Sequence, residues 1–575
     1  MILQALTQYY EDLVQRGEIA RPGWAKTKIS YALCINERGE LEQVIPLLET
    51  KEGSKKPQPQ QFDLPAPVGR TSTKIAPNFL WDNSGYILGV DAKGKPERSR
   101  ECFEACRQLH HQLLNEVDST AAKGILAFFD TWNPSAVCEH AALQKDFNII
   151  TAGGNLLFRV NGTFAHKDDA ICRAWQRHYD CTEAKKVQQC LVTGKNDVIE
   201  SIHPRIKGVD GAQSSGAALV SFNAPAFCSY GQEQNFNAPI GKYAAFAYTA
   251  ALNHLLADRK NVQKIGDTTV LCWAEGAQPQ YQTFILAALM GGQPKELSED
   301  DVRAAVKKLA AGERVPELDL KPEQNFYILG LAPNAARLSV RFFYRGTFGD
   351  LMKNVNAHHE RMEIIRPAYD KYATIPLWAM LRETVNPNSR EKNASPVMAG
   401  AAARAIFTNG LYPAALLEQT MLRIRAERDI TRGKAAIIKA YYLRNPNEDC
   451  PKEVLTVALN EASTNPAYTL GRLFSVYEAV QEAANPGINA TIRDKYFNSA
   501  ASTPATIFPV LGNLCQKHLR KLDAGKRVWY EKQITELKGI LGENYPARMT
   551  LPQQGSFDLG YYHQTQKRFT KKEEK

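Results

Sequence analysis

The stretch NFYILGLAPNAARLSVRFFYRGTFGDLMKNVNAHHERMEI, residues 325–364, decides the fold class. It opens with two apolar, β-favouring runs that a short polar turn separates. Its remainder carries apolar residues at helical spacing. The stretch therefore predicts strand, loop, strand and helix in that order.

Before this stretch the chain mixes helix and strand signals. Apolar residues at helical spacing predict helices over 2–14, 99–117 and 242–258. Runs of β-favouring residues predict strands over ISYALCI (29–35), ALVSFN (218–223) and DTTVLCWAE (267–275). Residues 51–74 are rich in Lys, Pro, Gln and Ser, so we expect a loop there.

Beyond about residue 373 strand signals nearly vanish, and the remaining segments, such as KAAIIKAYYLRN and TLGRLFSVYEAVQEAA, have helical spacing. We therefore predict an α+β multidomain protein, in which a mixed α/β N-terminal region precedes an all-α helical bundle at the C-terminus. The expected domains are residues 1–265, 266–372 and 373–575.

Composition indicates an ordinary globular protein. The 575 residues are 44% hydrophobic and 23% charged, which is too apolar for disorder. The sequence has neither a long apolar run nor a signal-peptide pattern, so we expect a soluble cytoplasmic protein. Its 11 cysteines are odd in number and scattered, and we expect them to be reduced thiols.

The basic excess lies near the C-terminus. The formal net charge is +10, from 71 basic and 61 acidic residues. Residues 401–575 contain 25 basic and 17 acidic residues, a net of +8, which leaves +2 for the first 400. This asymmetry favours a polyanionic partner, nucleic acid before membrane. A merely soluble basic surface is the alternative.

Sequence patterns of known catalytic sites are missing. VTGKND (192–197) lacks the glycine spacing and the Ser or Thr of a phosphate-binding loop, and neither HExxH nor GxSxG occurs. Cys172, Cys181 and Cys190 lie near His166 and His178, but no close CxxC pair accompanies them, so we favour thiols without metal. We expect no catalytic residue, metal or cofactor, and hence binding rather than catalysis.

Two loops are rich in neutral hydrogen-bonding side chains. SFNAPAFCSYGQEQNFNAP (221–239) gathers Asn and Gln, and GRTSTKIAPN (69–78) mixes Thr, Ser and Asn with Arg70 and Lys74. Amides and hydroxyls read base edges, whereas basic side chains mostly hold phosphates. The alternative is that these side chains cap turns and satisfy buried backbone groups.

A basic segment follows in the helical part. If MLRIRAERDITRGKAAIIKAYYLRN is helical on both sides of Gly433, then Arg425, Arg428, Arg432 and Lys439 project from one side. Such a stripe suits a phosphodiester backbone. A solvated helix face with intrahelical ion pairs is the alternative.

Four long segments resemble the large-subunit family of the type I-C CRISPR Cascade surveillance complex. They are RTSTKIAPNFLWDNSGYILGVD (70–91), residues 211–258, RGTFGDLMKNVNAHHERMEI (345–364) and LRIRAERDITRGKAAIIKAYYLRN (422–445). The resemblance implies a non-catalytic subunit that recognises the PAM beside the target in double-stranded DNA. It also implies roles in duplex opening, in R-loop stabilisation and in recruiting a separate helicase-nuclease for antiviral defence.

The resemblance further implies partners and places for contact. Expected partners are guide RNA, target DNA, the backbone subunits, the guide 5′-end subunit and small subunits, and no membrane. Residues 1–265 would recognise the PAM, 266–372 would contact other subunits, and 373–575 would resemble the small subunit and bind DNA strands. Our choice for PAM-side DNA contacts is Arg70, Thr71, Lys74, Asn78, Asn223, Gln232 and Asn237. Our choice for the strand backbone is Arg425, Arg428, Arg432 and Lys439.

Two other functions stay open on the sequence alone. One is a metal-dependent nuclease or hydrolase with an unrecognised active site. The other is a purely structural scaffold of a ribonucleoprotein, whose polar loops bind neighbouring subunits.

Overall fold

The computed structural model describes residues 1–49, 57–68, 75–92, 95–144, 146–180, 186–258, 262–291, 297–370, 372–390, 392–542 and 545–569. The chain forms two compact units. The first consists of Met1–Pro204 and Val220–His254, and the second of Arg205–Leu219 and Leu255–Lys575. The functions that we assigned to residues 1–265, 266–372 and 373–575 stay a prediction.

The first unit contains a sheet with the strand order β3-β2-β7-β6, and β8 pairs with β7 outside this path. The strands are β2 (Tyr31–Ile35), β3 (Leu41–Pro46), β6 (Trp81–Asn83), β7 (Asn155–Val160) and β8 (Thr163–Phe164). β2 and β3 are antiparallel, as the turn between them predicts, whereas β2 and β7 are parallel. The helices of this part are α2 (Ser84–Ile87), α3 (Pro96–Leu114), α4 (Thr120–Thr131), α5 (Phe147–Ala152) and α6 (Asp169–Asp180).

His110 lies at the centre of this core. The buried rings of Phe79, Phe129 and Phe158 surround its imidazole at centroid distances of 5.2, 4.7 and 6.0 Å. Its Nε2 accepts the backbone N–H of Leu80 at 3.0 Å, so the proton lies on Nδ1, which donates to the carbonyl of Cys106 at 2.8 Å. The ring thus acts as a satisfied neutral core residue.

The rest of the first unit holds smaller elements. They are α1 (Ile2–Gln15), α7, which begins in this unit (Lys242–Ala257), the antiparallel sheet β1-β5-β4 and the hairpin of β9 and β10. The strands are β1 (Trp24–Ile29), β4 (Leu48–Glu49), β5 (Gln58–Pro65), β9 (Val187–Gln189) and β10 (Asn196–Val198). Tyr10 of α1 packs edge-on against Phe246 of α7, with centroids 5.7 Å apart.

Two local predictions are wrong. Part of the expected 51–74 loop is strand β5, whose backbone pairs with β1 over residues 60–65 and with β4 over residues 58–59, although its sequence is rich in Gln. The expected strand ALVSFN is irregular, with isolated bridges only at Ala217 and Ala218 among the described residues. In both segments backbone pairing, rather than side-chain type, determines whether a strand forms.

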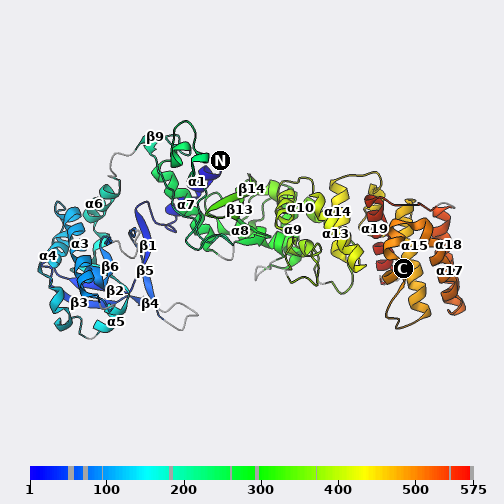
Figure 1. Ribbon diagram of the computed structural model, residues 1–575, viewed down its shortest axis with the longest axis horizontal. Helices are drawn as coiled ribbons and strands as arrows, with labels where there is room; N and C mark the ends of the chain where they lie inside the picture. The colour runs from blue at the N-terminus through cyan, green and yellow to red at the C-terminus, as the bar shows by residue number, and fades with distance from the viewer. Residues whose placement is uncertain are drawn as a thin grey trace. The chain divides into compact units, whose positions relative to one another are not determined.

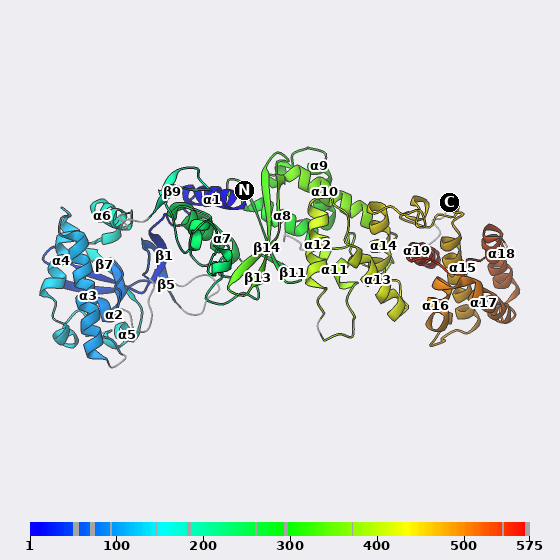
Figure 2. The same ribbon diagram turned by 45° about the horizontal axis from the view of Figure 1, so that its top comes forward.

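The second unit contains the antiparallel sheet β11-β12-β13-β14, against which α8 and α10 pack, and α9 packs against these two helices (Figure 2). Its strands are β11 (Gln263–Ile265), β12 (Thr268–Ala274), β13 (Asn325–Asn334) and β14 (Arg337–Thr347). The helices are α8 (Pro279–Met290), α9 (Glu299–Ala310) and α10 (Phe348–Met362). Strand, turn, strand and helix over 325–364 are confirmed.

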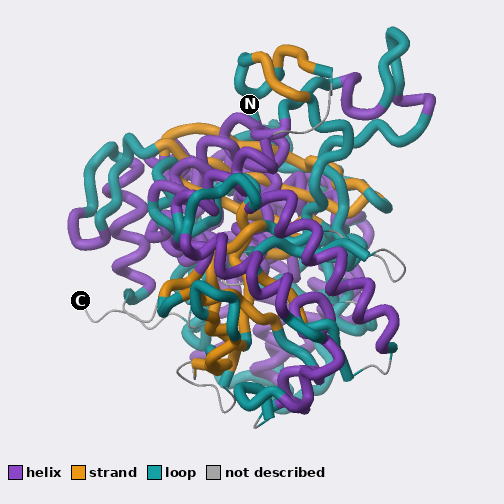
Figure 3. The backbone as a smooth tube through the Cα atoms, turned by 90° about the vertical axis from the view of Figure 1, so that its left-hand side faces the viewer, coloured by secondary structure: helices purple, strands orange, loops and turns teal. Residues whose placement is uncertain are grey.

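Helices make up the remaining described part of this unit. They are α11 (Leu377–Arg382), α12 (Pro396–Phe407), α13 (Ala414–Glu427), α14 (Arg432–Arg444), α15 (Pro466–Ala484), α16 (Ile492–Ser502), α17 (Pro504–Leu519), α18 (Ala524–Leu541) and α19 (Leu551–Lys567). The α+β fold class with a helical C-terminal part is confirmed. In Figure 3 more of the backbone tube is helix, in purple, than strand, in orange.

α15 is the buried centre of the C-terminal bundle, and α16, α17, α18 and α19 pack around it (Figure 1). Two glycines allow the closest of these contacts. A Cβ on Gly471 of α15 would overlap the carbonyl oxygen of Phe557, and a Cβ on Gly560 of α19 would overlap that of Tyr468. The two helices therefore approach each other backbone to backbone.

Candidate nucleic-acid interface

The polar loop 221–239 of the first unit is held by the carboxamide of Asn237. Its Oδ1 accepts the backbone N–H of Ser229 at 2.8 Å. Its Nδ2 donates to the carbonyls of Gln232 and Gln234 at 3.1 and 2.9 Å. Asn237 thus bonds to the backbone at three positions within the eight residues before it, and these bonds give the loop a defined shape without a sheet.

Gln232 is the second anchor. Its Oε1 accepts the ammonium of Lys186 at 2.8 Å, and the same ammonium lies 5.4 Å from the ring centroid of Phe236. A cation that the sequence did not single out therefore lies beside the polar loop. Asn235 is buried, and its Oδ1 has no hydrogen-bond partner among the described residues.

Asn223 and Tyr230 are two of the exposed side chains of this loop. Asn223 is exposed, and no side-chain partner is found for it in the described part of the chain. Tyr230 is 99% exposed and has a positive φ of 51°, next to Gly231 at 67°. Tyr230 and Gly231 form the tip of a tight turn, which leaves the tyrosine ring exposed to solvent. An aromatic residue directly before a glycine is the sequence signal for this tip, and our choice of site residues did not include it.

The second polar loop, residues 69–78, gives less support for a DNA contact. Arg70, Thr71 and Lys74 lie outside the described residues. Asn78 is only 3% exposed, and its Oδ1 accepts the backbone N–H of Val68 at 3.0 Å. The Asn78 side chain therefore supports a turn. The alternative that it satisfies a buried backbone group describes this residue better than the predicted DNA contact.

The expected basic stripe is not continuous, because the segment is not helical between the two helices that carry it. α13 ends at Glu427, and α14 begins at Arg432. The guanidinium of Arg432 is 8% exposed and donates to Asp370 at 2.9 Å and to the carbonyls of Tyr372 and Ala373. Arg432 therefore anchors the chain before α11 instead of facing solvent.

Lys439 is also inside, only 2% exposed. Its ammonium donates to the carbonyls of Glu360 and Arg361 at 3.3 and 3.0 Å, in the last turn of α10. A cation at a helix C-terminus stabilises the unpaired carbonyls and the helix dipole. Burial lowers the pKa of Lys439 to about 8. The positive charge of Lys439 thus stabilises α10 within the second unit.

Arg425 and Arg428 remain at the surface. Arg425 donates to Oε1 of Gln554 at 2.7 Å, and Arg428, in the left-handed conformation that ends α13, donates to the carbonyl of Asp494. Neither guanidinium lies within 4.0 Å of a carboxylate oxygen in the described part of the chain. These two arginines are the members of the predicted set that solvent can reach.

Another basic surface lies at the turn between α17 and α18, which the sequence analysis missed. Its exposed cations lack partners in the described part of the chain; they are Lys517, Arg520, Arg527 and Lys532. Beside them Trp529 is 55% exposed. Exposed cations interleaved with a bare aromatic ring are the composition of single-strand binding surfaces.

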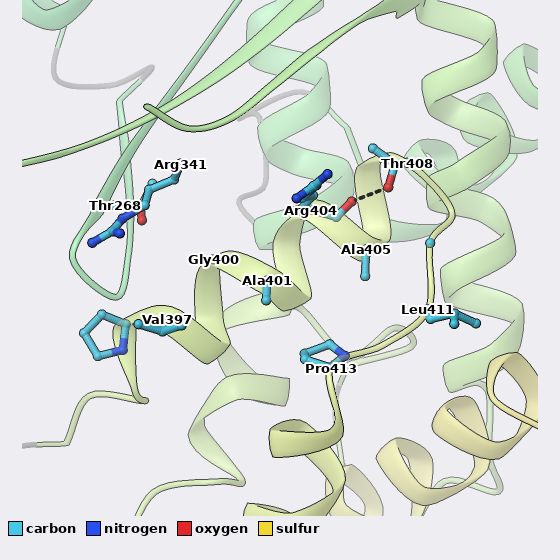
Figure 4. Close-up of a pocket in the computed structure, with 12 residues that line it drawn as sticks. Thr268, Arg341, Val397, Gly400, Ala401, Arg404, Ala405, Thr408, Leu411 and Pro413 are labelled. Carbon is cyan, nitrogen blue, oxygen red and sulfur yellow. Dashed lines mark hydrogen bonds between the residues drawn. The ribbon is translucent and has the colours of Figure 1, made fainter. Parts of the chain in front are cut away.

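A pocket of about 470 Å³ lies between the sheet and α12 in the second unit (Figure 4). Gly400 and Ala401 line it along the helix. Arg404 follows one turn later, and Arg341 of β14 faces the helix from the sheet. Arg341 pairs with Asp267 at 2.7 Å, whereas no described residue pairs with the Arg404 guanidinium. The small residues and the free guanidinium make this a third exposed cationic feature.

The described residues contain no group of three or more His, Cys, Asp or Glu side chains placed to hold a metal ion. Cys181 lies outside them. In the same part of the chain, every helix is too short or too polar to span a bilayer.

The fold and these surfaces define a two-unit α+β protein with a shaped polar loop and exposed cationic helices. The family model of the CRISPR-associated protein (Cas_Csd1) matches residues 6–569, so the chain belongs to this family. A comparison with curated proteins finds no match. The predicted large subunit of Cascade type is thereby confirmed at the level of the family, and membership of this family indicates a complex with other CRISPR-associated subunits and nucleic acid.

Proposed function

We propose that the chain is the non-catalytic large subunit of a type I-C CRISPR RNA-guided surveillance complex. In this role it recognises the PAM next to the target in double-stranded DNA, promotes duplex opening, stabilises the R-loop and helps recruit a separate helicase-nuclease. Family membership supports the proposal. The observation that carries it is the shaped loop 221–239, which presents an unpaired amide and a bare aromatic ring.

The chemistry of the loop suits a flanking-motif reader. In RNA-guided systems base pairing reads the target, and the protein reads only a short neighbouring motif. The free amide of Asn223 can accept from and donate to base edges in a groove. Tyr230 is placed to contact an opened base step, as exposed apolar or aromatic side chains do in minor-groove proteins. Lys186 adds a cation for a nearby phosphate.

We assign contacts with the backbone of the DNA strands to exposed cations of the second unit. Arg425 and Arg428 keep their proposed role because solvent reaches them. The surface between α17 and α18 joins them, whereas Arg432 and Lys439 support the fold. Contacts of this kind are not sequence-specific and weaken with salt.

The test uses the guide-loaded complex with wild-type chain or with Asn223→Ala. Asn223 makes no contact that the fold needs, so the variant should assemble normally. We expect binding to motif-containing duplex to fall roughly 5- to 150-fold, the loss of about 1–3 kcal/mol that a directly read base pair typically costs, while binding to scrambled duplex is unchanged. Equal loss on both duplexes would contradict motif reading.

The same preparations separate the two alternatives. A scaffold would lose assembly when Asn223, Gln232 and Asn237 are changed together, with no specific effect on motif preference. A nuclease or hydrolase would cleave DNA or RNA when the chain alone is incubated with Mg²⁺ or Mn²⁺. We expect neither outcome.

A further inference from the structure

We propose that a pocket between α11, α13 and α14 of the second unit binds one nucleotide whose base carries an exocyclic amino group. The pocket has a volume of about 290 Å³. It lies apart from loop 221–239 and from the basic turn between α17 and α18 in sequence, and it uses different residues. The three helices are labelled in Figure 2.

One wall of the pocket is aromatic. Trp378 of α11 is 43% exposed, and its indole N–H is already used, because it donates to the carbonyl of Met290 at 3.1 Å. This bond restrains the indole ring, which lines the pocket. A nucleobase stacks on the face of an indole, and every base has a π-surface that allows it.

The floor of the pocket is a buried ion network. The ammonium of Lys434 is 2% exposed and donates to Oε2 of Glu427 at 2.5 Å and to the carbonyl of Asp429 at 3.1 Å. Thr431, which caps α14, donates to Oε2 of Glu383 at 2.8 Å. A Cβ on Gly433 would overlap this Glu383 carboxylate, so the glycine makes room for it.

One acceptor in this floor is left open. Oε1 of Glu427 is buried and has no hydrogen-bond partner among the described residues. Lys434 donates to the other oxygen, Oε2, and Nη1 of Arg423 lies 3.9 Å from Oε1, beyond hydrogen-bond distance. A buried carboxylate oxygen without a donor is costly, which indicates that a ligand N–H completes the network.

The rim supplies positive charge. Arg382 and Lys392 both line the pocket and are exposed, and neither has an ion-pair or hydrogen-bond partner in the described part of the chain. Free cations at a pocket mouth attract a phosphate group.

An aromatic wall, an open acceptor and a cationic rim together match one ligand class. A nucleotide offers a planar base, amino N–H donors and a phosphate within a single small unit. Adenine, cytosine and guanine present an exocyclic amino group. The ring N–H of thymine lies between two carbonyl oxygens, which would face the Glu427 carboxylate. We therefore expect a preference against thymine.

The ligand chemistry is the same for a free nucleotide and for one unit of a single strand. The test therefore measures binding of dAMP, dTMP, a short oligo-dA and a short oligo-dT to the full-length chain at one low salt concentration. Binding of dAMP assigns a free-nucleotide site, and binding of oligo-dA alone assigns a strand unit. The inference is overturned if thymine ligands bind as well as adenine ligands, or if neither adenine ligand binds.

Variants locate the site. Trp378→Ala should weaken adenine-ligand binding roughly 5- to 150-fold, and Trp378→Phe should retain most of it because stacking survives. Trp529→Ala is the matched control, since this indole is also exposed but lies on α18. It should leave dAMP binding unchanged.

The double variant Arg382→Ala with Lys392→Ala changes only exposed side chains, so it tests the pocket even if Trp378→Ala unfolds. Unchanged binding in this double variant contradicts the inference.

This inference goes beyond the proposed function and does not depend on it. Nucleotide binding is measured on the chain alone, without guide or target. Motif preference of the complex can therefore fail while the pocket binds, and the reverse can also occur.

Discussion

The side-chain oxygen of Asn237 accepts the backbone N–H of Ser229 at 2.8 Å, and this bond closes the loop whose exposed tip is Tyr230. The loop therefore has its shape before any nucleic acid arrives. A preformed loop loses less conformational entropy on binding than a mobile one, which favours specific contacts.

Asn237→Ala removes the three hydrogen bonds that this carboxamide makes within the loop. Each is worth about 1 kcal/mol, so the loop should loosen. We expect faster amide hydrogen exchange at Ser229 and a loss of motif preference at least as large as in Asn223→Ala. In Asn223→Ala itself, exchange at Ser229 should stay at the wild-type rate. Wild-type exchange in Asn237→Ala would show that the carboxamide does not hold the loop.

Tyr230→Ala should impair duplex opening more than duplex binding. The ring is fully exposed, so the fold should not change. A stacked base is worth about 1–3 kcal/mol, which predicts a roughly 5- to 150-fold smaller equilibrium constant for opening beside the motif. A fluorescent base analogue at that step reports the opening. Tyr230→Phe keeps the ring and should open DNA like wild type; equal defects in both variants would point to the hydroxyl instead.

Acid should destabilise the first unit through His110. Burial, the largest cause, lowers the pKa of His110 to about 4, below its ordinary 6.5. The unfolded chain therefore binds a proton as pH falls below about 6.5, whereas the folded ring stays neutral down to about pH 4. Stability is present above the unfolded pKa and is lost as pH falls toward the folded one, by about 2 kcal/mol between pH 7.5 and 5.

Thermal unfolding at a series of pH values measures this loss. His110→Gln lowers stability overall but removes the titrating group, so its stability should depend less on pH over that range. An unchanged pH slope in His110→Gln would exclude His110 as a source of the acid sensitivity.

Gly560→Ala and Gly471→Ala should each destabilise the second unit strongly. The added methyl group would overlap a backbone carbonyl of the facing helix, and backbone cannot move aside as a flexible side chain does. We expect a loss of about 3 kcal/mol or more, at the upper end of overpacking effects. Gly539→Ala is the matched control, because nothing lies within 4 Å of its added Cβ. There alanine should stabilise α18 by about 0.5–1 kcal/mol. Differential scanning calorimetry compares the three.

Periodicity predicted the elements that have an apolar face. Strand, turn, strand and helix over 325–364 follow the sequence closely. β5 was missed because its Gln-rich sequence carries no strand signal, and backbone pairing with β1 and β4 makes it a strand. The burial of α19 could not be predicted for a related reason: its small and polar residues, such as Gly560 and His563, are buried by close helix packing that no single-helix pattern shows.

The site was less predictable because composition does not tell where a side chain points. Amides in the loop 221–239 include both anchors and free groups, and only the fold separates Asn237 from Asn223. Arg432 and Lys439 look like a basic stripe, but the break after α13 turns them inward to satisfy carbonyls. The open acceptor of Glu427 depends on a buried network that forms only in three dimensions.

The central claim is that this chain gives the complex its motif preference. The direct measurement is binding of target duplexes, with the flanking motif intact or scrambled, to guide-loaded complex reconstituted with and without the chain at fixed salt. We expect motif-dependent binding only when the chain is present. If both preparations bind the two duplexes alike, the chain does not read the motif and the proposed function is wrong.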